Sequence, residues 1–289
     1  MTTMAIIGGS GAYDLLGRNA LEKAKPAGPV TTPFGDVSNI HKFKGGSLEF
    51  LFLSRHGDDG YKTAAPFVNY RANIWALKEL GVERIISWSG PGVINPSLDV
   101  GAYAVPHDII DQTRRRPSTF FEKGGLGFIR MKHPFCPDLR HALMYSLHTN
   151  GERYYDEAVY CCTEGPRLET PAEIQLYHSY GADLVGMTLV PEAFLARELE
   201  MCYAPVCYLT NYAEGICERE YREGELFEGM QSKNEKEAVD TAMERLPALA
   251  MDALDAAASH GRDCECKDAM SRYKKRGDIT DDWRSWINP

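Results

Sequence analysis

A cationic pair, Arg55 and His56, follows an apolar run of the chain at residues 48–53. An Arg guanidinium offers a planar fork of N–H donors that matches phosphate oxygens, and a His adds a donor that depends on its protonation state. Residues 8–11, Gly-Gly-Ser-Gly, follow another apolar run and add the hydroxyl of Ser10. Both segments fit a small anion such as free phosphate, although a surface Arg–His pair and a plain strand-to-helix turn would look the same.

The glycine segment does not fit a nucleotide site. Counting from Gly9 and Gly11, the dinucleotide fingerprint needs a third glycine at position 14, which is Asp14. The segment also lacks the Gly-Lys-Ser/Thr ending of a P-loop. The chain contains no Gly-x-Ser-x-Gly and no His-Glu-x-x-His, so a covalent hydrolase and a zinc protease have no local support.

Glu169 and Asn211 have the chemistry to recognise the edge of a purine. A carboxylate only accepts hydrogen bonds, whereas an amide both donates and accepts. Glu169 could take the N1–H of a 6-oxopurine while Asn211 donates to N7 or O6. Because Glu169 directly precedes Thr170 and Pro171, where a helix begins, the spacing alone favours a plainer interpretation, a carboxylate stabilised by the helix dipole.

Met187 and Thr188 form a further pair, and Ser89 and Gly90 follow the largely apolar residues 85–88. Thr188 offers a hydroxyl, and the Met187 thioether is a soft apolar surface against which a sugar ring can lie. Met is also a common core residue, and spacing does not distinguish the two roles.

Alternating strand-like and helix-like segments carry these clusters. The clearest helix start has Thr170 at the N-cap, Pro171 at the first helical position and Glu173 in place to complete a capping box. The expected strands are residues 4–7, 48–53, 85–88, 183–187 and 204–209, and the expected helices are residues 69–80, 171–181, 191–200 and 234–258, the last with a kink at Pro247.

This order of elements predicts an α/β fold, with one domain over residues 1–261 and a mixed, mostly parallel central sheet flanked by helices. In such sheets ligands bind at the carboxyl ends of the strands, which is where the polar clusters lie. Residues 262–289 are charged and lack long periodicity, so we expect a C-terminal extension on the surface or on a neighbouring subunit.

The composition argues against several classes of protein. Of the 289 residues, 44% are hydrophobic and 25% are charged, which is typical of a globular chain. The net charge of −9 argues against a nucleic-acid partner, and the basic run at residues 114–116 fits a solvated or interface loop. Because there is no apolar run of ~18 residues and no basic leader region, we expect a cytoplasmic protein with no membrane partner.

Eight cysteines are scattered along the chain, several of them in apolar segments. In a chain of this length they predict buried, reduced thiols rather than a disulfide framework. Cys264 and Cys266 form one close pair, but no second pair or His cluster at zinc-finger spacing completes four ligands, so we predict no metal site.

Taken in order, the clusters resemble the trimeric purine nucleoside phosphorylase and 5′-methylthioadenosine phosphorylase family. The matching segments are residues 5–11, 54–57, 68–77, 110–113, 134–137, 164–170 and 185–192. The resemblance implies a phosphorylase/hydrolase-like fold and phosphorolysis of purine nucleosides, with inorganic phosphate as co-substrate and with neither cofactor nor metal. It also implies a homotrimer or homohexamer.

The resemblance further implies a role for each site residue. The residues implied for phosphate are Ser10, Arg55, His56, Ser89, Gly90 and Thr188. Those implied for the nucleoside are Leu168 on the base, Glu169 and Asn211 at its polar edge, Met187 under the ribose and Phe128 in a neighbour's site. Glu169, Asn211 and His56 would act in catalysis.

Two departures from the family pattern bear on the substrate. Adenine-using members carry Asp-x-Asp where this chain has Asn211, Tyr212 and Ala213, and Glu169 is present as in 6-oxopurine enzymes, which implies a preference for 6-oxopurines over adenine. Residues 58–66 lack the His that many relatives carry there. The open alternatives are an adenine-preferring methylthioadenosine phosphorylase, a nucleosidase that uses water, and a nucleoside-binding protein without turnover.

Overall fold

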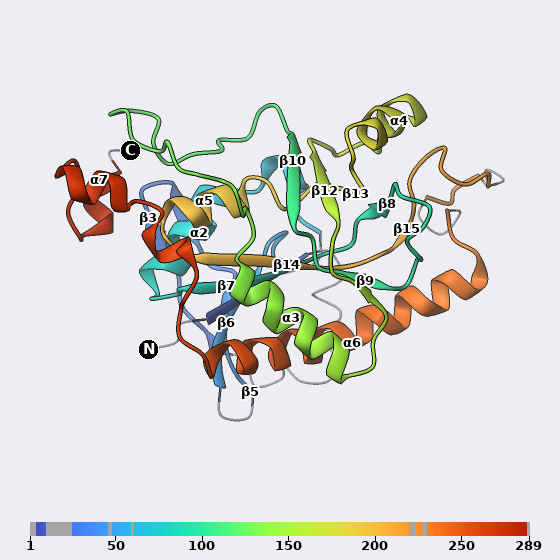
Figure 1. Ribbon diagram of the computed structural model, residues 1–289, viewed down its shortest axis with the longest axis horizontal. Coiled ribbons are helices and arrows are strands. Elements are labelled where there is room, and N and C mark those ends of the chain that lie inside the picture. The colour runs from blue at the N-terminus through green and yellow to red at the C-terminus, as the bar shows by residue number, and fades with distance from the viewer. Residues whose placement is uncertain are drawn as a thin grey trace.

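A computed structural model of the chain describes residues 4–9, 25–45, 48–58, 61–219, 223–226 and 230–287. Within these ranges an eight-stranded sheet forms the centre of the molecule, in the order β11-β9-β14-β7-β1-β6-β5-β2 (Figure 1). Its strands are β1 (Met4–Gly8), β2 (Lys25–Pro26), β5 (Ile40–Gly45), β6 (Leu48–Ser54), β7 (Arg84–Ser89), β9 (Tyr103–Ala104), β11 (Tyr154–Tyr155) and β14 (Cys202–Tyr208).

Four neighbouring strands of this sheet, β14, β7, β1 and β6, run parallel. Ala5 of β1 pairs with Leu51 of β6 and with Ile85 of β7, which sets the register of all three strands. β1, β7 and β14 are buried along their whole length, as largely apolar strands covered on both faces should be. β5 pairs antiparallel with β6 and β9 with β14, so the predicted mixed, mostly parallel sheet is confirmed.

A second, five-stranded sheet continues from the first, because β7 leads into β8 and β14 leads into β15. Its order is β10 (Asp108–Gln112), β12 (Val159–Thr163), β13 (Leu184–Gly186), β8 (Gly92–Val93) and β15 (Asn211–Tyr212). The sequence predicts only β13 of these strands. β8 and β15 are two residues long and β10 has no buried residue, whereas β12 was missed although four of its five residues are buried. A separate short hairpin joins β3 (Val30–Thr32) to β4 (Gly35–Val37).

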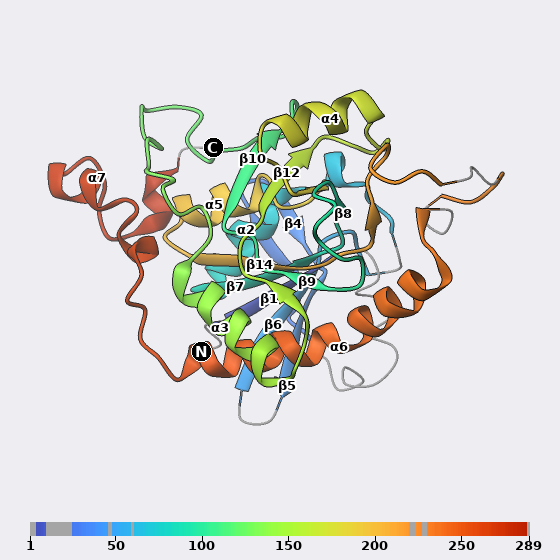
Figure 2. The ribbon, with the colours of Figure 1, turned by 45° about the vertical axis from the view of Figure 1, so that its right-hand side comes forward.

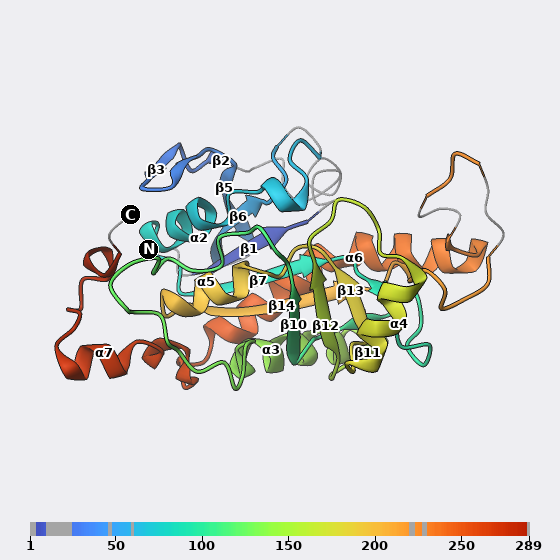
Figure 3. The same ribbon diagram turned by 90° about the horizontal axis from the view of Figure 1, so that it is seen from above.

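Helices cover both faces of the main sheet. α2 (Tyr70–Glu79) and α5 (Glu192–Glu198) pack together on one face, and α3 (Pro137–Thr149) and α6 (Lys233–Ala258) pack together on the other (Figures 1 and 2). α4 (Pro171–Ser179) lies beside the second sheet (Figure 3). The shorter helical segments are η2 (Ala65–Phe67), η4 (Glu265–Asp268), α7 (Ser271–Arg276) and η5 (Trp283–Trp286).

The strands and helices predicted from the sequence are present, with bounds that shift by a few residues. The capping box of α4 is confirmed, because the Thr170 hydroxyl accepts from the N–H of Glu173 and the Glu173 carboxylate accepts from the N–H of Thr170 at 2.8 Å. Pro247 lies inside α6. Within the described ranges, none of the helices combines the length and the apolar character that a membrane span requires.

Residues 262–287 lie against the domain of the same chain. Trp283 packs edge-on against Trp75 of α2, with ring centroids 4.7 Å apart, and Met270 and Tyr273 are buried. Figure 3 shows α7 at one end of the molecule. The C-terminal extension therefore packs on the surface of its own domain.

Candidate active site

The carboxyl ends of the strands open into a cavity of about 610 Å³. The ends of the main-sheet strands and the residues that follow them contribute Gly9, Arg55, His56, Ser89, Gly90 and Thr210 to its lining. The second sheet contributes Asn211 at the start of β15, Val185 and Gly186 of β13, and Met187 and Thr188 directly after β13. The polar clusters found in the sequence thus surround one space. Ser10, predicted to bind phosphate, lies outside the described residues.

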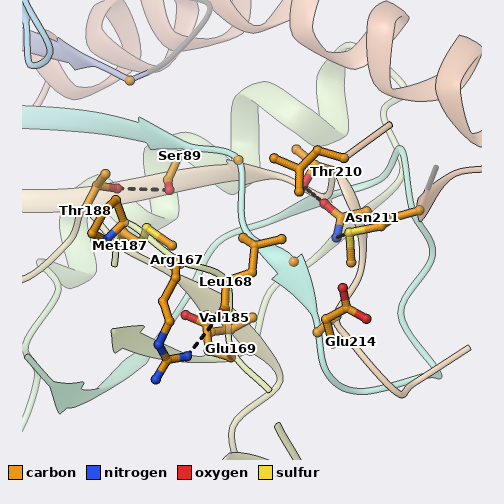
Figure 4. Close-up of a pocket in the computed structure, with 18 of the residues that line it drawn as sticks. Ser89, Arg167, Leu168, Glu169, Val185, Met187, Thr188, Thr210, Asn211 and Glu214 are labelled. Atoms are coloured by element: carbon orange, nitrogen blue, oxygen red, sulfur yellow. Dashed lines mark hydrogen bonds between the residues drawn. The ribbon is translucent and has the colours of Figure 1, made fainter. Parts of the chain in front are cut away.

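Hydroxyl groups gather at one end of the cavity. The side-chain oxygens of Ser89 and Thr188 are 3.1 Å apart (Figure 4), and the Tyr160 hydroxyl is 3.2 Å from Ser89 Oγ. Gly90 stands so close to Tyr208 and Thr210 that a Cβ at this position would lie 2.8 Å from both side chains. The glycine therefore allows the turn after β7 to pack closely against these two side chains. The hydroxyls of Ser89 and Thr188 could donate to a small anion in the cavity.

Arg55 has a different arrangement from the predicted one. Its side chain is buried; Nε and Nη2 donate to the two oxygens of Glu192, with Nη2 2.9 Å from Oε2, and Nη2 also donates to Ser87 Oγ at 2.7 Å. Glu192 thus already occupies two of the three guanidinium nitrogens, and phosphate binding by Arg55 remains a prediction. Nη1 has no hydrogen-bond partner in the described part of the chain, and a Cβ on Gly9 would be 3.2 Å from it.

Glu192 is a site residue that sequence reasoning missed. It is buried at the start of α5, and its Oε2 accepts a hydrogen bond from the Tyr203 hydroxyl at 2.8 Å. Burial disfavours a charged guanidinium, but attraction to the Glu192 carboxylate outweighs it and raises the pKa of Arg55 above its ordinary value. Glu192 therefore keeps a rigid positive charge behind the hydroxyl end of the cavity.

His56 is buried beside Arg55, and its Nδ1 is 2.8 Å from the carbonyl oxygen of Thr63. Burial and the nearby charge of Arg55 lower the pKa of His56 to about 4, so the ring is neutral at neutral pH. A neutral ring that donates through Nδ1 must accept through Nε2. The sequence left the donor role of His56 dependent on protonation, and the structure favours an acceptor at the cavity.

Tyr61 is a second missed residue, and it lies in the loop that lacks the expected His. Its ring stacks on His56, with centroids 4.2 Å apart, and it lines the cavity. Tyr61 is 55% exposed, so it forms a wall of the cavity rather than part of the core.

The other end of the cavity carries side chains suited to a heterocyclic base. Figure 4 shows Leu168 between Met187 on one side and Asn211 with Glu214 on the other. Asn211 is held by two contacts, because its Oδ1 accepts from Thr210 Oγ1 at 2.7 Å and its Nδ2 donates to the carbonyl of Tyr212 at 2.9 Å.

Glu169 lines the same end of the cavity, and its Oε1 accepts a hydrogen bond from Thr163 Oγ1 at 2.5 Å. The capping carboxylate of α4 is Glu173, which leaves Glu169 for the cavity. Arg167 lines the cavity as well, but its guanidinium is paired with Glu173 at 2.8 Å. Glu214, an exposed carboxylate three residues after Asn211, also lines the cavity and was not predicted, because it lies just beyond residues 211–213, where the family pattern has its two acids.

Phe128 does not line this cavity. It is 78% exposed, and its backbone N–H donates to the Tyr273 hydroxyl at 2.9 Å. Its predicted contact with a neighbour's site remains a prediction.

Arg116 differs from the solvated or interface loop expected for residues 114–116. It is buried, and it donates to the backbone carbonyl oxygens of Met187, Val190, Thr163 and Glu164, at distances from 2.5 to 3.1 Å. One guanidinium therefore joins the segment that follows β12 to the segment that follows β13, and these segments carry both ends of the cavity lining.

Comparison with known proteins agrees with this geometry. Residues 3–253 match the family described as the phosphorylase superfamily. The chain is 42% identical over 277 residues to a 6-oxopurine nucleoside phosphorylase of Pyrococcus furiosus, covering 93% of this chain and 98% of the relative. It is 44% identical over 230 residues to a probable S-methyl-5'-thioinosine phosphorylase of Methanothermobacter thermautotrophicus, covering 80% and 79%.

Solved structures of the same family share the fold. A methylthioadenosine phosphorylase sourced from an antarctic soil metagenomic library superposes with a TM-score of 0.81 at 30% identity, covering 94% of this chain and 91% of that one. A methylthioadenosine phosphorylase from Schistosoma mansoni in complex with adenine gives 0.80 at 25% identity, covering 94% and 97%. The extent of these matches and the shared fold establish that the chain belongs to the phosphorylase superfamily, in its purine nucleoside phosphorylase branch.

Proposed function

We propose that this protein cleaves purine nucleosides with inorganic phosphate, releasing the free base and a ribose 1-phosphate, and that it prefers 6-oxopurines to adenine. The observation that most supports this proposal is that one cavity joins two kinds of side chain. Hydroxyl groups and the buried Arg55 lie at one end, and Glu169, Asn211 and Leu168 lie at the other. The names of the Pyrococcus and Methanothermobacter relatives, a 6-oxopurine and a thioinosine phosphorylase, agree with the preference.

Phosphate would bind at the hydroxyl end. Ser89, Thr188 and Ser10 would donate to its oxygens, Gly90 would hold the turn after β7 beside it, and Arg55 would contribute its charge and the single donor Nη1. The neutral His56 can accept a hydrogen bond at Nε2, so it would take the P–O–H of a monoprotonated phosphate. This selects the protonated form of the anion and leaves an unprotonated oxygen free to attack.

The bond between C1′ and the purine nitrogen breaks as a phosphate oxygen bonds to C1′. The electron pair of the broken bond passes to the purine, and the sugar passes through an oxocarbenium-like state against which the bound anion lies. Met187 would lie under the ribose. No covalent nucleophile, organic cofactor or metal ion is needed in this step, because the site acts by positioning and by hydrogen bonds placed where charge develops.

Glu169 and Asn211 would determine the base. An ionised Glu169 accepts from N1–H of a 6-oxopurine, whereas adenine presents a lone pair at N1 and leaves both groups unsatisfied. Leaving such groups without hydrogen-bond partners lowers the binding free energy by about 1–3 kcal/mol, and by more when one of them is charged. Asn211 can donate to O6 or N7 as negative charge develops on the leaving base.

The test is base release from inosine, guanosine, adenosine, methylthioinosine and methylthioadenosine, each with and without phosphate. We expect phosphate-dependent release and a higher kcat/KM for each 6-oxopurine than for its adenine counterpart. The methylthio pair also shows which 5′ substituent is preferred.

Two matched variants identify the discriminating carboxylate. The amide of Glu169→Gln can donate to adenine N1. We therefore expect this variant to reduce the ratio of kcat/KM for inosine to kcat/KM for adenosine by about 10-fold or more. Glu214→Gln makes the same change at the other carboxylate of the cavity and should leave the gap in place. Wild-type preference for adenine, or a gap that closes only in Glu214→Gln, contradicts the assignment of Glu169.

We also propose that the protein works as a homotrimer or a dimer of trimers, with Phe128 at the border between subunits. The high exposure of this aromatic ring and the family resemblance support the proposal.

A further inference from the structure

Four buried cysteines meet far from the cavity described above. The sulfur atoms of Cys136, Cys202, Cys264 and Cys266 all lie within 4.8 Å of one another, and none of these residues lines the cavity. Cys136 precedes α3, Cys202 begins β14, and the last two flank the start of η4. The sequence prediction of no metal site rested on the absence of a second close pair or His cluster, and the fold brings two single cysteines from separate elements beside Cys264 and Cys266.

The spacing of the sulfurs suits a tetrahedral metal ion. Zinc–sulfur bonds of about 2.3 Å place the sulfurs of a tetrahedron roughly 3.8 Å apart. The Cys202 and Cys264 sulfurs are 3.4 Å apart, and no pair in the cluster exceeds 4.8 Å. All four thiols are free, so each can supply a thiolate ligand.

The charge around the cluster also suits a metal thiolate. Arg197 Nη1 donates to Cys266 Sγ at 2.9 Å, and the Arg262 guanidinium lies close enough to Cys202 and Cys264 to interact with their charge. A divalent ion with four thiolates has a net charge of −2, and Arg197 and Arg262, the latter also paired with Glu83 at 3.6 Å, place positive charge beside it. Four neutral thiols, by contrast, would leave both guanidiniums beside groups that accept hydrogen bonds only weakly.

We propose that Cys136, Cys202, Cys264 and Cys266 bind one structural zinc ion. Four protein ligands leave no open position for a substrate, which is the arrangement of structural rather than catalytic zinc sites. Two ligands belong to the domain and two to residues 262–287, so the ion fastens the C-terminal extension to the domain. Arg197 and Arg262 hold the thiolates from outside the first coordination sphere.

The test is metal analysis of the full-length protein, purified without chelator, together with its intact mass under non-reducing conditions. We expect about one zinc ion per chain and a mass with all eight cysteines reduced. Cys266→Ser should lose the bound zinc, whereas Cys217→Ser, outside the cluster, should retain it. Arg197→Met should weaken zinc binding about 10–100-fold in competition with a chromogenic chelator, since it removes only an outer contact.

Cobalt exchange tests the site without any variant that might fail to fold. Cobalt(II) in wild-type protein should give the intense visible bands of tetrahedral thiolate coordination. Zinc-free protein whose mass is lower by two hydrogens per disulfide within the cluster overturns the proposal. Stoichiometric iron in place of zinc, or zinc that Cys266→Ser retains in full, also overturns it.

Discussion

At the scale of residues, the side chains that carry the proposed chemistry could be named from the sequence, but their partners could not. Arg55 and Glu192 are 137 positions apart, and only the fold brings them together. Glu169 and Asn211 were ambiguous in the sequence because a carboxylate at a helix start has a local explanation. The structure adds that Glu169 lines the cavity and accepts a hydrogen bond from Thr163, while Glu173 completes the capping box of α4.

We expect Arg55 to have a structural role as well as a role in phosphate binding. Arg55→Ala leaves the Glu192 carboxylate buried without a partner, which should lower the free energy of unfolding by about 3–5 kcal/mol. The double variant Arg55→Met, Glu192→Leu replaces the pair with apolar groups and should recover most of that stability. Denaturant unfolding and the KM for phosphate, measured on both variants, separate the two roles.

The double variant should be folded but should still have a strongly raised phosphate KM, because the charge is gone. A double variant with the wild-type phosphate KM would show that Arg55 only supports the fold.

His56 should make the protein less stable in mild acid. Its folded pKa of about 4 lies below its ordinary value of 6.5, so the unfolded chain binds a proton more readily than the folded one. The stabilising contribution is complete above pH 6.5, decreases as the pH falls towards about 4, and amounts to about 3 kcal/mol. Unfolding free energies from pH 8 to pH 4, compared between wild type and His56→Gln, measure this contribution as the difference in pH dependence. Parallel profiles for the two proteins would contradict it.

At the scale of elements, the long buried strands were predictable and the short ones were not. β1, β6, β7 and β14 are largely apolar runs, and their carboxyl ends were expected to hold the site. β8 and β15 have two residues each, too few for any periodic signal, yet they connect the main sheet to the second sheet. The close approach of Gly90 to Thr210 was therefore invisible in the sequence.

Gly90 should be needed for the close packing of the turn after β7 against Tyr208 and Thr210. In Gly90→Ala the new methyl group would meet Tyr208 and Thr210 at 2.8 Å, so the turn after β7 must shift. We expect a loss of about 1–3 kcal/mol in stability and a higher phosphate KM, because the turn carries the hydroxyl end of the cavity. Gly261→Ala is the control, since its nearest contact would be 3.6 Å away. Equal behaviour of the two variants in thermal unfolding and phosphate kinetics would contradict the expected role.

At the scale of the whole molecule, the fold class and the family followed from the order of the segments, whereas contacts across the chain did not. The C-terminal extension carries too little periodicity for its packing to be predicted. Its Trp283 nevertheless lies against Trp75 of α2, and its cysteines meet two others that are more than 60 positions away. Such contacts depend on how distant parts of the chain pack together. The helical and strand periodicity of short segments does not predict this packing.

We expect the exposed ring of Phe128 to lie at a subunit border. Phe128→Asp would place a charge in that border, so sedimentation should show a shift from trimers or hexamers to smaller species and a fall in kcat/KM. Tyr180→Asp changes an exposed aromatic residue elsewhere and serves as the comparison. A wild-type protein that is fully active as a monomer would contradict this expectation.

Phosphorolysis itself is tested most directly by following the phosphorus atom. With inosine and inorganic phosphate as the only substrates, ³¹P NMR should show a sugar 1-phosphate signal that grows in step with the release of hypoxanthine. The phosphate signal should fall by the same amount. Hypoxanthine released together with free ribose, while the phosphate signal stays constant, would show that water is the nucleophile and would contradict the account.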